Sequence, residues 1–140
     1  MKTGLFIQSY QVSTGLLGAP TFELHLAVNT PQKSISGQGV VSNDSIHHPP
    51  MEIYSNLCGE FSYMTVMPNK THVLVNLKGI GVSSPITPLE IQNFKLTMVL
   101  ESDWQKGTAN YSYMNERGDW NEIKDANVIA VAVKELINNN

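Results

Sequence analysis

The 140-residue sequence has only one cysteine, Cys58, and unusually few charged residues. A single cysteine excludes a fold held together by internal disulfides, and it is compatible with a reducing compartment. Charged residues make up 15% of the chain, against roughly 25% in average soluble domains. Nine basic and twelve acidic residues give a net charge of −3. Nucleic-acid binding needs a dense basic surface, so we expect no nucleic-acid partner.

Long hydrophobic runs are also missing. The longest apolar run covers residues 128–133, which is too short to span a bilayer. Near the N-terminus only residues 5–7 are apolar without interruption, and this is too short for the core of a signal peptide. These features predict a cytoplasmic protein without a membrane span, and they leave export without a classical signal open.

Short runs in which apolar and polar residues alternate are present along nearly the whole chain. The clearest run covers residues 22–28, where Phe22, Leu24, Leu26 and Val28 share one parity. A period of two places these side chains on one face of a β-strand, whereas a helix would scatter them around its circumference. The sequence therefore predicts an all-β protein.

The boundaries of the strands follow from the same alternation and from turn residues. The predicted strands cover residues 5–12, 22–28, 35–41, 51–67, 72–78, 94–101, 108–113 and 128–133, with a helix over 125–137 as the alternative at the C-terminus. The run 51–67 is long and carries apolar side chains on both faces, so Gly59 is predicted to be a bulge or corner between two sheets. The stretch 79–93 is rich in glycine and proline and is predicted to cross over the end of the sheets.

This pattern predicts one domain over residues 1–133, followed by a flexible tail over 134–140. The predicted architecture is an antiparallel β-sandwich of eight or nine strands. A small up-and-down barrel of the lipocalin and avidin type is the alternative. The distinction bears on function because a barrel can hold an internal ligand cavity.

Several segments together carry a family resemblance. They are Thr3-Gly-Leu-Phe6, Gly18-Ala-Pro20, Val28-Asn-Thr-Pro31, Ser36-Gly-x-Gly39, Tyr63-Met-Thr-Val-Met-Pro68 and Asp103-Trp-Gln-x-Gly-Thr-Ala-x-Tyr-x-Tyr113. The chain resembles, over about residues 3–133, a family of small bacterial proteins described only as a domain of unknown function. The resemblance implies a bacterial source and supplies no catalytic residues to carry over.

No arrangement of residues typical of catalysis or metal binding stands out. Cys58 lies within a predicted strand, where a small core residue is expected, and a nucleophile would need an adjacent base. His47 and His48 are adjacent, so on extended backbone they point in opposite directions and chelate poorly. His25 and His72 lie in predicted strands with no indication that they meet. We expect a protein that is not an enzyme and that has no metal and no cofactor.

Aromatic residues form the most informative group. Trp104, Tyr111, Tyr113 and Trp120 lie within seventeen residues, and Tyr111 and Tyr113 share a face of one predicted strand. Such rings can stack on a sugar or anchor a protein partner, although aromatic pairs also stabilise the cores of sheets. Trp104 lies in a predicted loop and is expected to be the most exposed of the four.

Two functions remain open at this point. A binding or assembly module, self-associating or joined to a protein partner, would use the second apolar face of the run 51–67, with Tyr54, Met64 and Val66 as interface residues. A small-molecule or carbohydrate-binding protein would use a barrel cavity or a surface formed by Trp104, Tyr111, Tyr113 and Trp120. The sequence favours the first.

Overall fold

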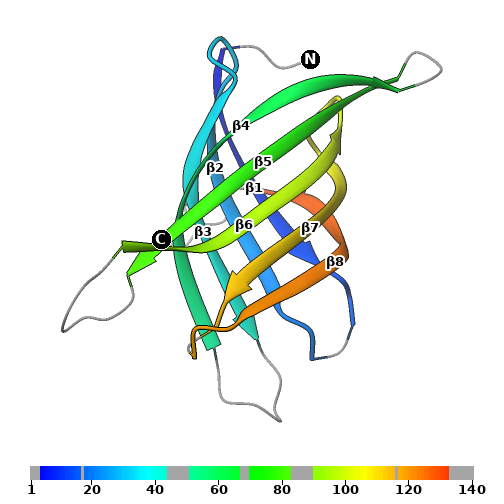
Figure 1. The fold of residues 1–140 in the computed structure, drawn as a ribbon. Coiled ribbons are helices and arrows are strands. Elements are labelled where there is room, and N and C mark those ends of the chain that lie inside the picture. Colours follow the sequence, from blue (N-terminus) through cyan, green and yellow to red (C-terminus); the bar gives the residue numbers. More distant parts are fainter. Residues whose placement is uncertain are drawn as a thin grey trace, which may run out of the picture.

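The structure, a computed structural model, describes residues 4–16, 18–43, 51–66, 70–82, 90–115 and 117–132. Within these residues the chain forms eight strands, which Figure 1 labels in order: β1 (Leu5–Ser13), β2 (Thr21–Asn29), β3 (Ser34–Asn43), β4 (Met51–Val66), β5 (Lys70–Val82), β6 (Glu90–Glu101), β7 (Lys106–Met114) and β8 (Trp120–Val131). None of the described residues belongs to a helix that is long and apolar enough to cross a membrane.

The eight strands form one closed antiparallel barrel, in which each strand pairs with the next and β1 pairs with β8 (Figure 1). The all-β prediction is confirmed, and the architecture is the alternative barrel rather than the sandwich. Closure depends on the antiparallel pairing of Ser9–Ser13 with Asn127–Val131. Alternation within each strand is the same in a sandwich and in a barrel, so it could not reveal this pairing.

The long run 51–67 is one strand without a corner. β4 pairs with β3 over Met51–Glu60 and with β5 over Asn56–Val66, and neither pairing shifts register at Gly59. The predicted bulge is therefore wrong, because tilted barrel strands can pair with one neighbour in their first half and with the other in their second. The predicted apolar second face is real: Tyr54 and Cys58 both face outward and are exposed.

The stretch 79–93 does not cross over the sheets. Gly79–Val82 extends β5, Glu90–Asn93 begins β6, and these two strands are antiparallel neighbours. The predicted crossover is wrong, because Gly79 and Gly81 lie within β5 and this strand pairs directly with β6. Residues 83–89 lie outside the described residues.

The last strand is longer than the alternation indicates. β8 begins at Trp120, and no described residue of the alternative helix is helical. A register shift against β7 between Ala109 and Tyr111, together with a positive φ of 58° at Asp125, interrupts the alternation of inward side chains. Val133 and the predicted tail 134–140 lie outside the described residues.

The interior of the barrel is filled with side chains. Among the described residues, the largest fully buried side chains come from five of the eight strands and one turn: Tyr10, Val12, Phe22, Leu24, Leu26, Val28, Leu77, Phe94, Met98, Leu100, Trp104 and Tyr111. Eight strands enclose a space that side chains can just fill. The fold therefore places its accessible clefts at the ends and on the outer wall of the barrel.

Candidate functional site

Three of the four predicted aromatic ligand contacts are buried. Tyr111 and Tyr113 point into the barrel, and Trp104, expected to be exposed, has no exposed surface at all. Trp120 is the exception, with 45% of its surface exposed on the outer wall. The prediction of exposure for Trp104 is wrong because this loop residue folds back over the end of the barrel.

Trp104 closes that end of the barrel. Its ring makes edge-to-face contacts with Phe6 and Phe61, at centroid distances of 5.1 and 5.0 Å. The hydroxyl of Tyr10 donates a hydrogen bond of 2.7 Å to the Trp104 carbonyl oxygen. These contacts hold Trp104 at a positive φ of 64°, although its indole Nε1 is buried and has no hydrogen-bond partner among the described residues.

A second aromatic cluster fills the interior towards the other end. The Phe22 ring lies 4.1 Å from that of Phe94 and 5.5 Å from that of Tyr111, measured between centroids. Tyr113 adjoins Tyr111 at 6.3 Å. Tyr111 and Tyr113 are therefore core residues, in agreement with the interpretation that aromatic pairs stabilise the core of the sheet.

Burial changes the acidity of these tyrosines. Desolvation raises the pKa of Tyr10 well above its usual range, and the charge of Asp103 adds to this effect. Desolvation also strongly raises the pKa of Tyr111, with a contribution from Tyr113, and it raises that of Tyr113. All three phenols stay protonated at neutral pH.

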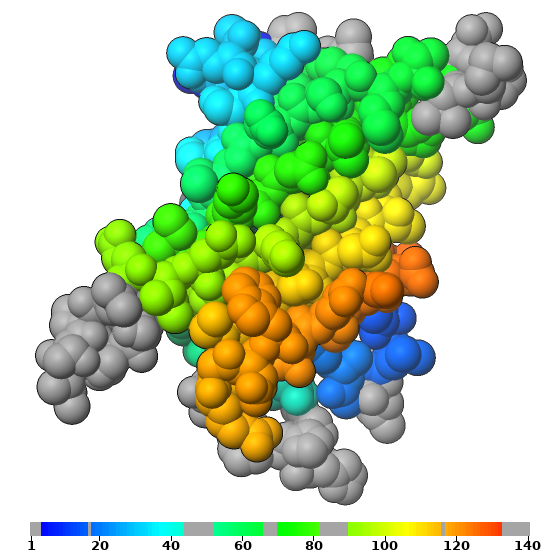
Figure 2. Space-filling view, viewed as in Figure 1, coloured from blue at the N-terminus to red at the C-terminus, as the bar shows by residue number. Residues whose placement is uncertain are grey.

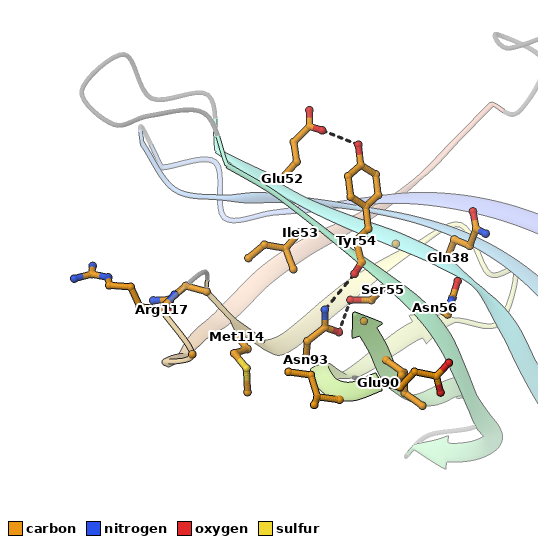
Figure 3. Close-up of a pocket in the computed structure, with 16 residues that line it drawn as sticks. Gln38, Glu52, Ile53, Tyr54, Ser55, Asn56, Glu90, Asn93, Met114 and Arg117 are labelled. Atoms are coloured by element: carbon orange, nitrogen blue, oxygen red, sulfur yellow. Dashed lines mark hydrogen bonds between the residues drawn. The ribbon is translucent and has the colours of Figure 1, made fainter. Parts of the chain in front are cut away.

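A large cleft lies at the barrel end opposite Trp104, and we call it the mouth groove. It has a volume of about 810 Å³, and Figure 3 shows how its side chains are arranged. The groove follows the part of β4 that precedes Asn56, where pairing with β5 stops. Side chains from both faces of β4 reach this free edge. The lining residues are Gln38, Gly39, Glu52, Ile53, Tyr54, Ser55, Asn56, Ile80, Gly81, Glu90, Ile91, Asn93, Met114, Asn115, Arg117 and Gly118.

Asn93 links the two sides of the mouth groove. A register shift between β5 and β6 pairs Gly79 with Phe94 and Ile80 with Gln92, so Asn93 is left as the extra residue of a bulge. Its Nδ2 donates a hydrogen bond of 3.1 Å to the Tyr54 carbonyl oxygen of β4. Its Oδ1 accepts a hydrogen bond of 2.7 Å from the Ser55 hydroxyl (Figure 3).

Gly81 makes room for this bridge, since a Cβ at that position would overlap Nδ2 of Asn93. Only 8% of Asn93 and 5% of Ser55 is exposed. An amide group has two N–H donors and an oxygen with two lone pairs, and a hydroxyl oxygen can accept as well as donate. Among the described residues, these two bonds therefore leave one Nδ2 donor and acceptor positions on Ser55 and Asn93 for a ligand.

Tyr54 presents an aromatic surface on the outer face of β4, and in Figure 3 its ring points away from Ser55 and Asn93. Its side chain is 66% exposed, and its hydroxyl donates a hydrogen bond of 2.6 Å to Oε2 of Glu52 (Figure 3). That bond and the charge of Glu52 raise the pKa of Tyr54. Tyr54 thus stays neutral at neutral pH.

Two of the three predicted interface residues, Tyr54 and Met64, lie on the outer wall of β4. Tyr54 is exposed, Met64 is half-buried, and the side chain of Val66 lies outside the described residues. Asn93 and Ser55 were not predicted. The sequence marks neither of them, because Asn93 has the same parity as the outward Lys95 and Thr97 and only the bulge makes it the extra residue.

The histidines and the cysteine take simple positions. The His25 Nδ1 is hydrogen-bonded to the Ser9 hydroxyl at 2.8 Å, on the outer wall. Cys58 is exposed rather than in the core, which corrects its predicted place. His47 and His48 lie outside the described residues. Within the described ranges no three His, Cys, Asp or Glu side chains gather as a metal site would require.

Comparison with known proteins identifies the family but no activity. No curated protein matches the chain. A family model described as a domain of unknown function, DUF1842, matches residues 3–120, which confirms the resemblance noted in the sequence up to the start of β8. Since this match covers most of the chain, the protein belongs to the DUF1842 family.

Proposed function

We propose that the protein is a non-catalytic binding module that holds a small polar ligand of the saccharide type in the mouth groove. The observation that carries this proposal is the buried pair of Ser55 and Asn93, which keeps free hydrogen-bonding positions at the groove. Buried polar groups are usually fully paired, so free capacity beside an open cleft favours a ligand that completes it.

The size and chemistry of the groove support a saccharide. Its volume of about 810 Å³ lies within the usual range for small-molecule sites. Gln38 and Asn56 add amide groups, which can each donate and accept hydrogen bonds to sugar hydroxyls. Tyr54 adds a ring whose apolar face suits the C–H side of a sugar, and its bond to Glu52 lowers the cost of ordering it.

Titration calorimetry against neutral oligosaccharides, chosen by a glycan array, tests this proposal. We expect Tyr54→Ala to weaken binding about tenfold or more, which is the loss of one stacking contact. Tyr54→Phe should weaken it less, because the ring remains and only the bond to Glu52 is lost. Ser55→Ala should also weaken binding, since it removes the hydroxyl that Asn93 holds.

Thr108→Ala is the matched control, because Thr108 is exposed on β7 and does not line the mouth groove. Its affinity should equal that of the unmodified protein. An array without any ligand, or a ligand that binds the Tyr54→Ala and Ser55→Ala proteins unchanged, would rule out the mouth groove as the site.

Self-association is the second candidate, and exposed apolar side chains on neighbouring strands favour it. Leu5 and Ile7 of β1 and Ile129 of β8 all point outward with most of their surface exposed. A second copy could cover this face. Light scattering at high protein concentration tests the idea. Dimers that Ile7→Glu dissociates would support it, and a 15.5 kDa monomer would contradict it.

A further inference from the structure

The outer wall of the barrel carries a second cleft, distinct from the mouth groove. It has a volume of about 690 Å³ and runs across β4, β5, β6, β7 and β8, which form the face shown in Figure 2. We call it the wall groove. Its polar lining includes Asn76, Lys78, Lys95, Thr97, Asn110 and Ser112.

Two lysines stand side by side in the wall groove. Lys78 of β5 is directly opposite Lys95 of β6, and both are exposed. Their other lateral neighbours are uncharged, Cys58 beside Lys78 and Ser112 beside Lys95. Like charges directly opposite each other destabilise a sheet, so this pair costs the fold stability unless an anion offsets it.

Carboxylates of the described residues form no ion pair with either lysine. Glu60 and Glu122 also line the wall groove, but within the described residues neither lies within 4.0 Å of Lys78 or Lys95. Glu122 instead forms an ion pair with Lys124, at 3.6 Å. Neither ammonium group thus has an anionic partner in direct contact among the described residues, and both can contact an external anion.

Trp120 positions one of the two charges. The Lys95 ammonium nitrogen lies 5.9 Å from the centre of the Trp120 ring, within the range of a cation–π contact. Trp120 is therefore connected to this groove through Lys95, and it lies outside the mouth groove. Beside the lysines, the Thr97 hydroxyl donates a hydrogen bond of 2.9 Å to the Asn76 amide oxygen, which orders two polar groups along the floor.

We propose that the wall groove binds an acidic saccharide, with its carboxylate between Lys78 and Lys95 and its hydroxyl groups on the amide and hydroxyl side chains beside them. The pair of lysines selects a negative charge. Asn76, Thr97, Asn110 and Ser112 offer neutral donors and acceptors of the kind that a polyhydroxylated ligand needs. The site does not depend on the mouth groove.

NMR titration of the full chain with trigalacturonate tests this proposal, and maltotriose serves as the neutral probe. We expect saturable shifts centred on Lys78, Lys95 and Thr97, and binding that weakens as sodium chloride is added. Lys78→Gln/Lys95→Gln should reduce the affinity at least tenfold. It should also keep or raise the melting temperature, because it removes the opposed charges.

Lys70→Gln/Lys106→Gln is the matched control, since it removes the same charge from exposed positions outside the wall groove. It should bind as the unmodified protein does. Equal losses of affinity in both double variants would overturn the proposal, because binding would then depend only on the net charge of the protein. The absence of saturable binding would also overturn it. If sulfate bound as tightly as trigalacturonate, the groove would recognise negative charge alone, and the proposal of a saccharide ligand would be overturned. Tyr54→Ala should leave trigalacturonate binding unchanged. Failure of the wall-groove proposal can therefore be told apart from failure of the mouth-groove proposal.

Discussion

At the scale of single residues, the two tryptophans have opposite environments and can be told apart by fluorescence. Trp104 is fully buried, whereas Trp120 is 45% exposed. The Trp120→Phe protein should therefore emit at short wavelength and resist quenching by acrylamide. The Trp104→Phe protein should emit at longer wavelength and be quenched readily. Ready quenching of Trp104 in the Trp120→Phe protein would contradict its position over the end of the barrel.

Substitutions of Trp104 are predicted to lower the stability of the fold by graded amounts. Trp104→Ala should lower the free energy of unfolding by about 3–5 kcal/mol, since it removes the ring that packs on Phe6 and Phe61. Trp104→Phe should cost much less, because the lost Nε1 donor is buried without a partner. Urea unfolding of the unmodified, Trp104→Ala and Trp104→Phe proteins measures this order. Equal losses of stability in the two variants would show that packing at this end does not decide the stability.

The buried tyrosines predict how stability responds to alkaline pH. Folding raises the pKa of Tyr10, Tyr111 and Tyr113, chiefly through desolvation. Unfolded tyrosine loses its proton near pH 10, so the stabilisation is complete below that pH and declines above it. Ultraviolet titration should show these three phenols ionising only as the protein unfolds. Ionisation of all five tyrosines near pH 10 with the fold intact would refute this.

At the scale of strands, three glycines allow neighbouring backbones to approach closely. A Cβ on Gly37, Gly59 or Gly107 would overlap a carbonyl oxygen of the adjacent strand, from His25, Asn76 and Val99 respectively. Barrels use glycine at such points to let strands curve. The glycine in the middle of β4 is thus a site of close contact rather than the predicted corner.

Gly59→Ala should therefore lower the free energy of unfolding by about 1–3 kcal/mol, because β4 and β5 must move apart to admit the methyl group. Ser62→Ala is a control on the same strand, with an outward and exposed side chain, and should change stability by less than about 0.5 kcal/mol. Thermal unfolding of both proteins measures the difference. A Gly59→Ala protein as stable as the control would contradict the close approach.

Local pattern predicted the strands well and their connections poorly. Phe22–Val28 and Phe94–Leu100 alternate cleanly, and β2 and β6 contain them. Residues 79–93 and the region around Asp125 were misread, because bulges and paired glycines there belong to strands. A bulge changes the parity of side chains, and no rule of alternation within one strand can locate it.

The candidate site could be predicted even less. Ser55 and Asn93 are far apart in the sequence and meet only because β4 lies next to β5 and β6 at the mouth. The aromatic group was visible in the sequence, but its burial depends on closure of the barrel. Of the four aromatic residues, only Trp120 has the exposure that a ligand contact needs.

At the scale of the whole molecule, the barrel has two unlike ends. Trp104 closes one end with apolar contacts, and the mouth groove at the other end carries the buried polar pair of Ser55 and Asn93. The filled interior separates them and keeps ligands at the surface. The two proposed binding sites are each lined by residues of several strands, so both require the closed barrel, and closure depends on the pairing of β1 with β8.

That closure predicts cooperative unfolding. Val128 of β8 is buried and pairs with Val12 of β1, so Val128→Ala should lower the free energy of unfolding by about 1–3 kcal/mol. Ile129→Ala, one residue further and exposed, should change it little. Because eight strands share one core, amide exchange in the Val128→Ala protein should quicken in β4 and β5 as much as in β1 and β8. Faster exchange confined to β1 and β8 would instead mean that the barrel can open at this seam while the rest stays folded, and the filled interior would then be accessible to ligands.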